Sequence, residues 1–370
     1  MFVAASASTV NAQGATLKDA YRDAFLIGSA LNPGVISGND TATRNIVLKQ
    51  FNTISPENVM KHQSINPQPG VFNWGPADAY VEFGEKNGMF VVGHTLVWHN
   101  STPAWFFLDK DGKPNPSDVQ LERLRGYIEA VAGRYKGRVG GWDVVNEVID
   151  NDGSYRKTTW VNAIGNGDTL VKYAFKYAQQ YAPGTELYYN DFNAWRPTKR
   201  DGIVRLVRML KKEGIRIDGV GMQGHWGLNF PKTEYIEAAI DSFANVGMKV
   251  MITEMDVDVL PLTREGQIIG QVMSDPQFQL EEFKTYLDPY RGGLPPDVQK
   301  QLADRYAELF GIFYKKRDKI DRVTFWGVHD GASWKNGYPI PGRMNYPLLF
   351  GRDRKPKPAF DAVLAVPRRP

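Results

Sequence analysis

Short hydrophobic runs alternate with amphipathic stretches along most of this chain. The amphipathic stretches repeat their apolar residues every three or four positions, as in 121–135 and in 203–210, which stops before Gly214, and this period is typical of helices. The hydrophobic runs are short and bounded by polar or glycine-containing segments, which is typical of strands. We predict eight strands, at residues 25–31, 51–54, 90–97, 139–148, 186–190, 219–223, 249–255 and 322–328.

Eight strands that alternate with helices, most of them apolar throughout, indicate parallel strands covered on both sides. We therefore predict an α/β fold, a single (β/α)8 barrel that forms one catalytic domain over residues 17–370. An open, doubly wound sheet is the alternative, but no strand is followed by a Gly-x-Gly-x-x-Gly turn or a P-loop. Residues 258–317 exceed one helix and are expected to hold an insertion that ends in a helix at 298–313. Ser117 and Asp118 are the expected capping residues of the helix that follows them.

Composition narrows the class of partner. The 45 basic and 41 acidic residues give a net charge of +4 without a basic stripe, so we expect no nucleic-acid partner. No run approaches the roughly 18 apolar residues of a membrane span, so no membrane association is expected. The absence of cysteine excludes disulfides and thiol nucleophiles.

Residues 1–16 are small and weakly apolar and contain an Ala-x-Ala pattern. This pattern is typical of the end of an export signal, although no basic segment precedes it. We expect a disordered leader or a signal-peptide remnant, and hence a secreted or periplasmic protein. We further expect a monomer that binds a largely uncharged partner.

Polar and aromatic side chains gather where the predicted strands end, which is where barrels of this kind carry their chemistry. All five histidines, His62 included, lie in or beside these segments. So many polar groups are costly to bury unless they converge on a polar ligand. A metal site is disfavoured because no His-x-x-x-His or His-Glu-x-x-His spacing occurs, and we expect no metal and no cofactor. The residues at these ends include Glu57, Asn58, Lys61, His94, Trp98, Glu147, Tyr189, Gln223, His225, Glu254, Trp326 and Trp334.

Two of these residues, Glu147 and Glu254, each end an apolar run and are expected to face each other across the barrel mouth. Two such carboxylates serve best in the cleavage of an acetal, where one protonates the leaving oxygen and the other meets the anomeric carbon. Asn146 is placed to bind a sugar 2-hydroxyl, and His225 and Asp256 are expected to form a chain behind Glu254 that keeps it ionised.

The same interpretation requires Glu147 to arrive protonated, with a raised pKa. We expect the second carboxylate, together with partial burial by Trp98 or Trp334, to raise the pKa of Glu147.

The chain resembles the glycoside hydrolase family 10 endo-β-1,4-xylanases from about Leu17 to Val363. The resemblance rests on Glu57-Asn-Val-Met-Lys61, Gly93-His-Thr-Leu-Val-Trp-His99, Trp142-Asp-Val-Val-Asn-Glu147, Tyr189-Asn-Asp191, Gly221-Met-Gln-Gly-His225, Ile252-Thr-Glu-Met-Asp256 and Phe325-Trp-Gly-Val328 with Ser333-Trp334.

This resemblance implies endo-hydrolysis of xylan and xylo-oligosaccharides by a retaining double displacement. Glu147 would be the acid/base and Glu254 the nucleophile, with carboxyl groups about 5 to 5.5 Å apart. Tyr189 would help to form the site beyond the scissile bond. The residues implied for the sugar sites on the non-reducing side are Glu57, Asn58, Lys61, His94, Trp98, Gln223, Trp326 and Trp334, beside Asn146 and His225.

Three positions depart from the family pattern. Ser101 stands where the family frequently has a glutamine, so the glutamine contact to the second sugar is in question. Trp226 and His329 replace smaller residues, so we expect a narrower cleft or an additional stacking face.

Two other functions stay open at this point. A β-1,4-glucanase on the same barrel is one, although Lys61 and Trp334 would crowd the C6 hydroxymethyl group of glucose and favour xylose. A non-catalytic carbohydrate-binding protein is the other, and the presence of both glutamates disfavours it.

Overall fold

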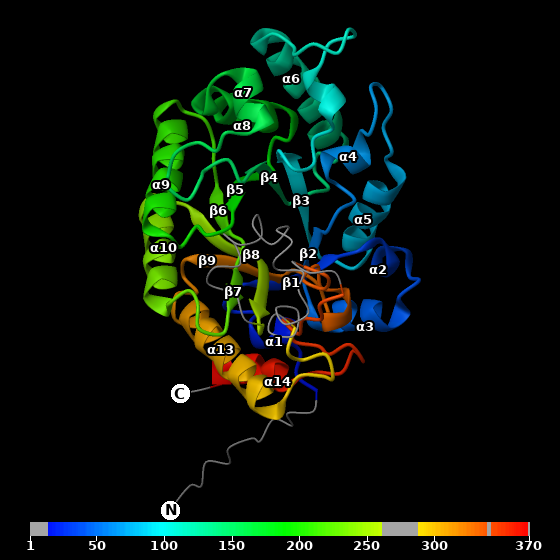
Figure 1. Cartoon of the computed structure of the whole chain (residues 1–370), viewed down its shortest axis with the longest axis vertical. Coiled ribbons are helices and arrows are strands. Elements are labelled where there is room, and N and C mark those ends of the chain that lie inside the picture. Colours follow the sequence, from blue (N-terminus) through cyan, green and yellow to red (C-terminus); the bar gives the residue numbers. More distant parts are fainter. Residues whose placement is uncertain (1–13, 261–287, 339–341, 369–370) are drawn as a thin grey trace, which may run out of the picture.

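Eight parallel strands close into a barrel in the computed structural model, which describes residues 14–260, 288–338 and 342–368 (Figure 1). Each strand pairs with its neighbour in sequence order, and pairing of β6 with β8 closes the ring. The predicted (β/α)8 barrel is thereby confirmed. Its strands are β1 Leu26–Leu31, β2 Thr53–Pro56, β3 Phe90–Val97, β4 Gly141–Asn146, β5 Glu186–Asp191, β6 Gly219–Met222, β8 Lys249–Asp258 and β9 Ile320–Phe325.

A ninth strand, β7 at His225–Gly227, was not predicted. It runs parallel to β8, with His225 opposite Asp256. The chain interrupts the sixth strand at Gly224, whose φ of 83° belongs to the left-handed region, and then resumes extended structure. The interruption lets two successive segments contribute side chains to the same barrel end.

Helices surround the barrel (Figure 1). The predicted helix at 298–313 lies within α13, and α13 packs its buried face, which includes Phe310, against Phe325 of β9. None of the helices in the described ranges combines the length and apolarity that a membrane span requires. The helices are α1 Leu17–Ala20, α2 Pro33–Ser37, α3 Thr41–Gln50, α4 His62–Ile65, α5 Gly75–Lys86, α6 Ser117–Arg134, α7 Thr159–Ile164, α8 Gly167–Tyr181, α9 Pro197–Lys212, α10 Thr233–Asn245, α13 Pro296–Lys315 and α14 Pro358–Ala365, with 3-10 turns η1 Ala104–Phe107, η3 Asp330–Ala332 and η4 Val366–Arg368.

The start of α6 differs from its predicted form. Pro116 occupies the N-cap position, and no side chain caps the helix. The hydroxyl of Ser117 instead donates to the carbonyl of Ile164 at 2.9 Å and ties α6 to α7. By contrast, α8 has a regular cap, because the Asn166 side chain accepts from the two backbone amides at the helix start.

Two glycines allow adjacent strands to carry large aromatic side chains. A Cβ atom on Gly93 of β3 would lie 2.2 Å from the ring of Trp142, and one on Gly141 of β4 would lie 2.2 Å from the ring of Tyr188. Both indole and phenol rings are fully buried. Glycine is therefore required for β3, β4 and β5 to pack this closely, and β3 and β4 bring His94 opposite Asp143.

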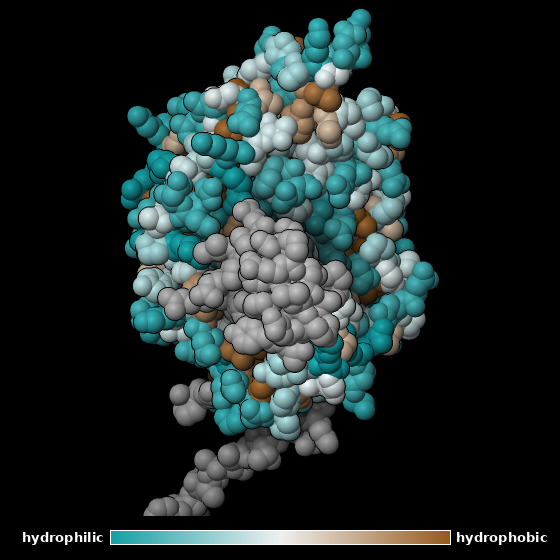
Figure 2. All heavy atoms as spheres, viewed as in Figure 1, coloured by the Kyte–Doolittle hydropathy of each residue, from teal (hydrophilic) through white to brown (hydrophobic). Residues whose placement is uncertain are grey.

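The face of the molecule drawn in Figure 2 is mostly hydrophilic, with hydrophobic residues scattered in small groups. Two of the predicted segments fall partly outside the described residues. They are the leader at 1–16, described only from residue 14, and the insertion at 258–317, in which 261–287 are outside.

Candidate active site

Glu147 stands immediately after β4, where the chain leaves the barrel. The predicted strand ran on to residue 148, but β4 ends at Asn146 because Glu147 has a φ of 59°. A residue other than glycine in this left-handed conformation costs the folded protein on the order of 1 to 3 kcal/mol of stability. The backbone amide of Glu147 stays anchored to the carbonyl of Asn190 on β5 at 2.9 Å. The turn thus places a carboxylate at the barrel end from a firmly held backbone.

The carboxylate of Glu147 accepts hydrogen bonds from three neutral donors. Trp98 donates its indole N–H to Oε2 at 3.0 Å, and Gln223 donates its amide to Oε1 at 2.8 Å. Asn146 adds a longer contact to Oε1 at 3.3 Å. Only 8% of Glu147 is exposed, so these donors replace most of its hydration.

The pKa of Glu147 in the free protein lies below its usual value, against the sequence-based expectation. Burial raises the pKa, but the hydrogen bonds from Gln223 and Trp98 and the electrostatic influence of His99 and Lys199 outweigh it. Trp98 was expected to raise this pKa by covering the carboxyl group. Its indole N–H points at the carboxylate instead and favours the charged form.

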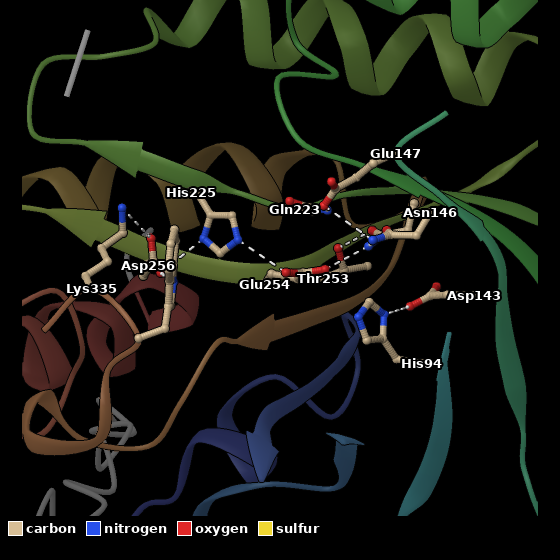
Figure 3. Close-up of polar contacts among 12 residues, drawn as sticks. His94, Asp143, Asn146, Glu147, Gln223, His225, Thr253, Glu254, Asp256 and Lys335 are labelled. Carbon is tan, nitrogen blue, oxygen red and sulfur yellow. Dashed lines mark hydrogen bonds and ion pairs between the residues drawn. The ribbon is translucent and has the colours of Figure 1, made fainter. Parts of the chain in front are cut away.

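Glu254, on β8, is held through both of its carboxylate oxygens. Asn190 donates to Oε1 at 2.8 Å, and Nε2 of His225 lies 3.2 Å from Oε2. The other ring nitrogen of His225 lies 3.0 Å from Oδ2 of Asp256, which is fully buried (Figure 3). The predicted chain behind Glu254 is therefore present.

The imidazole in this chain is protonated on both ring nitrogens, and therefore positively charged, at neutral pH. Burial lowers the pKa of His225, but the charge of Asp256 and the hydrogen bonds to Asp256 and Glu254 raise it to about 9. In this form both ring nitrogens donate, one to each carboxylate. The arrangement favours an ionised Glu254 in a fixed orientation.

Asn190 connects the two glutamate neighbourhoods. Its amide donates to Oδ1 of Asn146 at 2.9 Å as well as to Glu254, and its own Oδ1 accepts from Thr253 at 2.6 Å. The sequence-based set of site residues did not include Asn190. Its place in the Tyr-Asn-Asp motif at the end of the fifth strand was the signal that could have identified it.

His94 packs against Trp98 and Trp326 beside the two glutamates. His94 is 2% exposed, and its Nδ1 lies 2.9 Å from Oδ2 of Asp143 (Figure 3). The ring of Trp326 meets the ring of His94 edge to face at a centroid distance of 5.4 Å. Both residues lie at the strand ends where the sugar sites were predicted, and both are mostly buried.

Lys61 contributes a positive charge from the loop after β2. Its ammonium donates to Asn58 at 2.8 Å and lies 4.9 Å from the centre of the Trp98 ring. Burial lowers the pKa of Lys61, and the negative charges of Glu57 and both strand-end glutamates oppose this. Burial likewise raises the pKa of Glu57. These residues therefore lie close to the two glutamates, as predicted.

Trp334 covers the Glu254 side of the site. Its indole N–H donates to Oδ2 of Asp256 at 2.8 Å, and its ring meets that of His225 at 5.1 Å. The side chain is 38% exposed. The expectation that Trp334 buries Glu147 is not borne out by these contacts, which belong to the support of Glu254.

Comparison with known proteins assigns this arrangement to a family. The model of glycosyl hydrolase family 10 matches residues 16–366. The chain belongs to glycosyl hydrolase family 10.

Its relatives in family 10 cover nearly the whole chain. It is 42% identical to endo-1,4-beta-xylanase A of Xylanibacter ruminicola over 95% of this chain and 93% of that protein, and 38% identical to a beta-1,4-xylanase of Dictyoglomus thermophilum over 93% and 89%. Among solved structures, a GH10 endoxylanase retrieved from a sugarcane soil metagenome superposes with a TM-score of 0.87, at 40% identity over 95% and 99% of the two chains. A mutant protein solved in complex with xylotriose superposes with a TM-score of 0.82, at 33% identity over 95% and 99%.

Two positions at which this chain departs from the family 10 pattern are buried. Trp226 is 2% exposed and packs against Phe313 of α13, and His329 is 6% exposed. Neither ring offers an additional stacking face. Ser101, the third departure, is also buried, at 1% exposed.

The family 10 resemblance implied that Tyr189 helps to form the site beyond the scissile bond, but Tyr189 does not line that site. It is fully buried. Its hydroxyl donates to Asp191 and accepts from the backbone amide of Ile149 at 3.0 Å. Tyr189 thus fixes the chain just after Glu147 from behind.

His62 lies outside the site, although it was grouped with the other histidines. It is fully buried, and its ring stacks on Tyr127 at a centroid distance of 3.8 Å. Burial lowers the pKa of His62 to about 3. Across the described residues, no group of three or more histidine, aspartate or glutamate side chains is arranged to hold a metal ion.

Proposed function

We propose that this family 10 protein is an endo-1,4-β-xylanase that cleaves xylan internally with retention of anomeric configuration. Glu254 acts as the nucleophile and Glu147 as the acid/base. The observation that carries the proposal is the contrast between the two carboxylates. Glu254 accepts from a protonated imidazole, whereas Glu147 accepts from the neutral side chains of Gln223 and Trp98, with His99 and Lys199 as smaller electrostatic influences.

In the first step, the sugar ring lies between the two carboxyl groups. Glu147 transfers its proton to the glycosidic oxygen, the bond from that oxygen to C1 breaks, and a carboxylate oxygen of Glu254 bonds to C1. Substrate binding expels water from the neighbourhood of Glu147, and this desolvation raises its pKa toward the protonated state.

In the second step, the same residues act in reverse order. Glu147, now a carboxylate, takes a proton from water as the water oxygen bonds to C1. The bond from C1 to Glu254 breaks, and Glu254 is regenerated as a carboxylate. Two inversions at C1 give net retention.

Xylan is favoured over a β-1,4-glucan at this site. Lys61 and Trp334 both lie close to the Glu254 region, where the C6 hydroxymethyl group of glucose would add bulk. A missing or additional group of this size is worth about 1 to 3 kcal/mol. Initial rates on xylan and on carboxymethylcellulose measure this preference, and equal rates would contradict it.

The mechanism is tested on the intact chain with soluble xylan. We expect early formation of short xylo-oligosaccharides of several lengths, and proton NMR should detect the β-anomer of the new reducing end before mutarotation. Early release of the α-anomer would exclude the double displacement, and release of xylose alone would exclude internal cleavage. A matched sample without enzyme sets the mutarotation baseline.

Two further expectations accompany the proposal. We expect the protein to act as a monomer on polymeric xylan, which light scattering checks directly. We also expect export from the cell, as the composition of residues 1–16 indicates. Cell fractionation of a culture that expresses the full gene tests the second expectation.

A further inference from the structure

An ion pair extends the chain of contacts behind Glu254 one residue beyond Asp256. The ammonium group of Lys335 lies 3.5 Å from Oδ1 of Asp256 (Figure 3) and 3.4 Å from Oδ2 of Asp258. Lys335 is 7% exposed and follows Trp334 directly in sequence. A lysine is rarely buried to this extent without a partner of opposite charge, so the contact with these carboxylates accounts for its position.

Asp256 depends on this lysine for its charge balance. Its Oδ2 is shared by the ring nitrogen of His225 and the indole N–H of Trp334. Its Oδ1 is buried without a hydrogen-bond partner in the described part of the chain, and the atom of opposite charge that faces it is the ammonium of Lys335. A fully buried carboxylate left uncompensated would instead take up a proton.

We propose that Lys335 is a positioning residue for xylan hydrolysis, whose charge keeps Asp256 ionised and thereby, through His225, holds Glu254 ionised and correctly aimed. The Lys335 ammonium contacts Asp256, Asp258 and the ring of Trp334, so it acts on Glu254 through its neighbours. The proposal rests on the assignment of Glu254 as nucleophile.

The electrostatics of the chain agree with this geometry. Burial raises the pKa of Asp256, and the strongest opposing influence is the charge of Lys335, followed by that of His225. Burial lowers the pKa of Lys335, but the charges of Asp256 and Asp258 raise it above its ordinary value. Each group thus stabilises the charged form of its neighbour.

The sign of the effect follows from the charges around Asp256. Removing Lys335 makes this buried cluster more negative, so it takes up a proton at higher pH. The acidic limb of the pH profile of kcat/KM therefore moves upward. The groups that face this cluster are Glu254, Asp256 and Asp258 on β8, His225 on β7, Lys335 in the loop after β9, Tyr306 on α13, Arg343 near Asp258, and Lys61 near Glu254.

The decisive measurement is the pH dependence of kcat/KM for Lys335→Met on soluble xylan. We expect the acidic limb to move up by about one pH unit, with about a tenfold loss of kcat/KM on that limb and less than about a threefold change on the plateau. Lys335→Arg retains the charge and should return the limb to within about 0.3 units of the wild-type position.

Asp258→Asn changes the same contact from the opposite side. It removes a negative charge that competes for Lys335, so the acidic limb should move to lower pH. A purely structural role for Lys335 would not produce opposite shifts in the two variants. If Lys335→Met does not fold, the direction of the Asp258→Asn shift decides the question, and an unmoved limb overturns the proposal.

Lys357→Met is the matched control. Lys357 forms a buried ion pair with Asp330 at 2.9 Å, on residues that make no contact with the Glu254 chain. We expect lower stability and an unmoved acidic limb. If Lys335→Met lowers kcat/KM equally at every pH and leaves the limb in place, Lys335 is structural and the proposal is wrong. Failure of the proposed function itself would show separately, as hydrolysis that survives Glu254→Ala.

Discussion

The two glutamates of the site lie in opposite kinds of surroundings, although both are buried at the same end of the barrel. Glu254 faces charges: a protonated His225, then Asp256, then Lys335. Glu147 accepts its hydrogen bonds from dipoles, the side chains of Trp98 and Gln223, and the charged groups around it have smaller influences.

This difference matches the two tasks. A nucleophile must be ionised in every resting molecule, and a chain of alternating charges favours one protonation state strongly. An acid/base must exchange a proton twice per turnover, which requires surroundings that tolerate both states. Neutral donors such as an indole or an amide suit that requirement, because they carry no charge of their own.

Removal of each carboxylate is the most severe test of this comparison. Glu254→Ala should lower kcat on xylan by about 10⁴-fold or more, because no covalent intermediate can form. Glu147→Ala should lose about 10³-fold on xylan, but far less in the first step on an aryl xyloside with a good leaving group, which needs no protonation. Initial rates and burst kinetics on both substrates measure the difference.

Added azide separates the two variants further. It can enter the space left by Glu147 and attack the glycosyl intermediate, so it should accelerate Glu147→Ala and give a β-glycosyl azide. With Glu254→Ala an azide product should have the α configuration. The same product from both variants would show that the two roles are misassigned.

Acid inactivation sharpens the comparison by separating the site from the fold. His62 has a pKa of about 3 in the folded protein and an ordinary value of 6.5, so the unfolded chain binds a proton that the folded chain does not. Its contribution to stability is complete above pH 6.5 and declines as the pH falls toward 3. By pH 4 the loss should be about 3 kcal/mol.

Urea unfolding at pH 7 and pH 4 measures this loss. His62→Phe keeps a ring against Tyr127 and removes the titrating group, so it should be less sensitive to acid than the wild type. If the two proteins lost equal stability between the two pH values, His62 would not be the source. The midpoint of activity loss in the same buffers then reports on the Glu254 chain separately.

The smallest expected effect concerns the dipolar side of the comparison. Trp98→Phe removes the indole N–H that donates to Glu147, which favours the neutral acid and raises the pKa of Glu147. The alkaline limb of kcat/KM should therefore move up by about half to one pH unit, with a modest rise in KM. A downward shift, or a shift confined to the acidic limb, would contradict the assignment of Glu147 as the acid.

The barrel was predictable from sequence because its strands are short apolar runs separated by helix-period segments. The interruption at Gly224 was not, since a single glycine does not disclose whether a strand ends or resumes. The end of β4 was also misplaced. Apolar residues resume at Val148 after Asn146 and Glu147, and only the left-handed backbone of Glu147 ends the strand earlier.

The site was predictable in its residues and less so in their orientations. Both glutamates and the His225 to Asp256 chain follow from strand-end position. The directions of side chains do not: Tyr189 and Trp226 lie near predicted strand ends yet are buried in the protein. Lys335 left no signal, because one lysine after an aromatic residue resembles any surface charge until its burial is known.

The double hold on Glu254 has a consequence for how the reaction proceeds. With Oε1 tied to Asn190 and Oε2 to His225, the carboxylate has little room to travel toward the anomeric carbon. The movement in the first step therefore belongs to the sugar. Its C1 moves from the departing oxygen to the stationary carboxylate of Glu254, while the rest of the polysaccharide stays bound. The carboxylate of the enzyme thus stays in place, and the sugar of the polysaccharide moves to it.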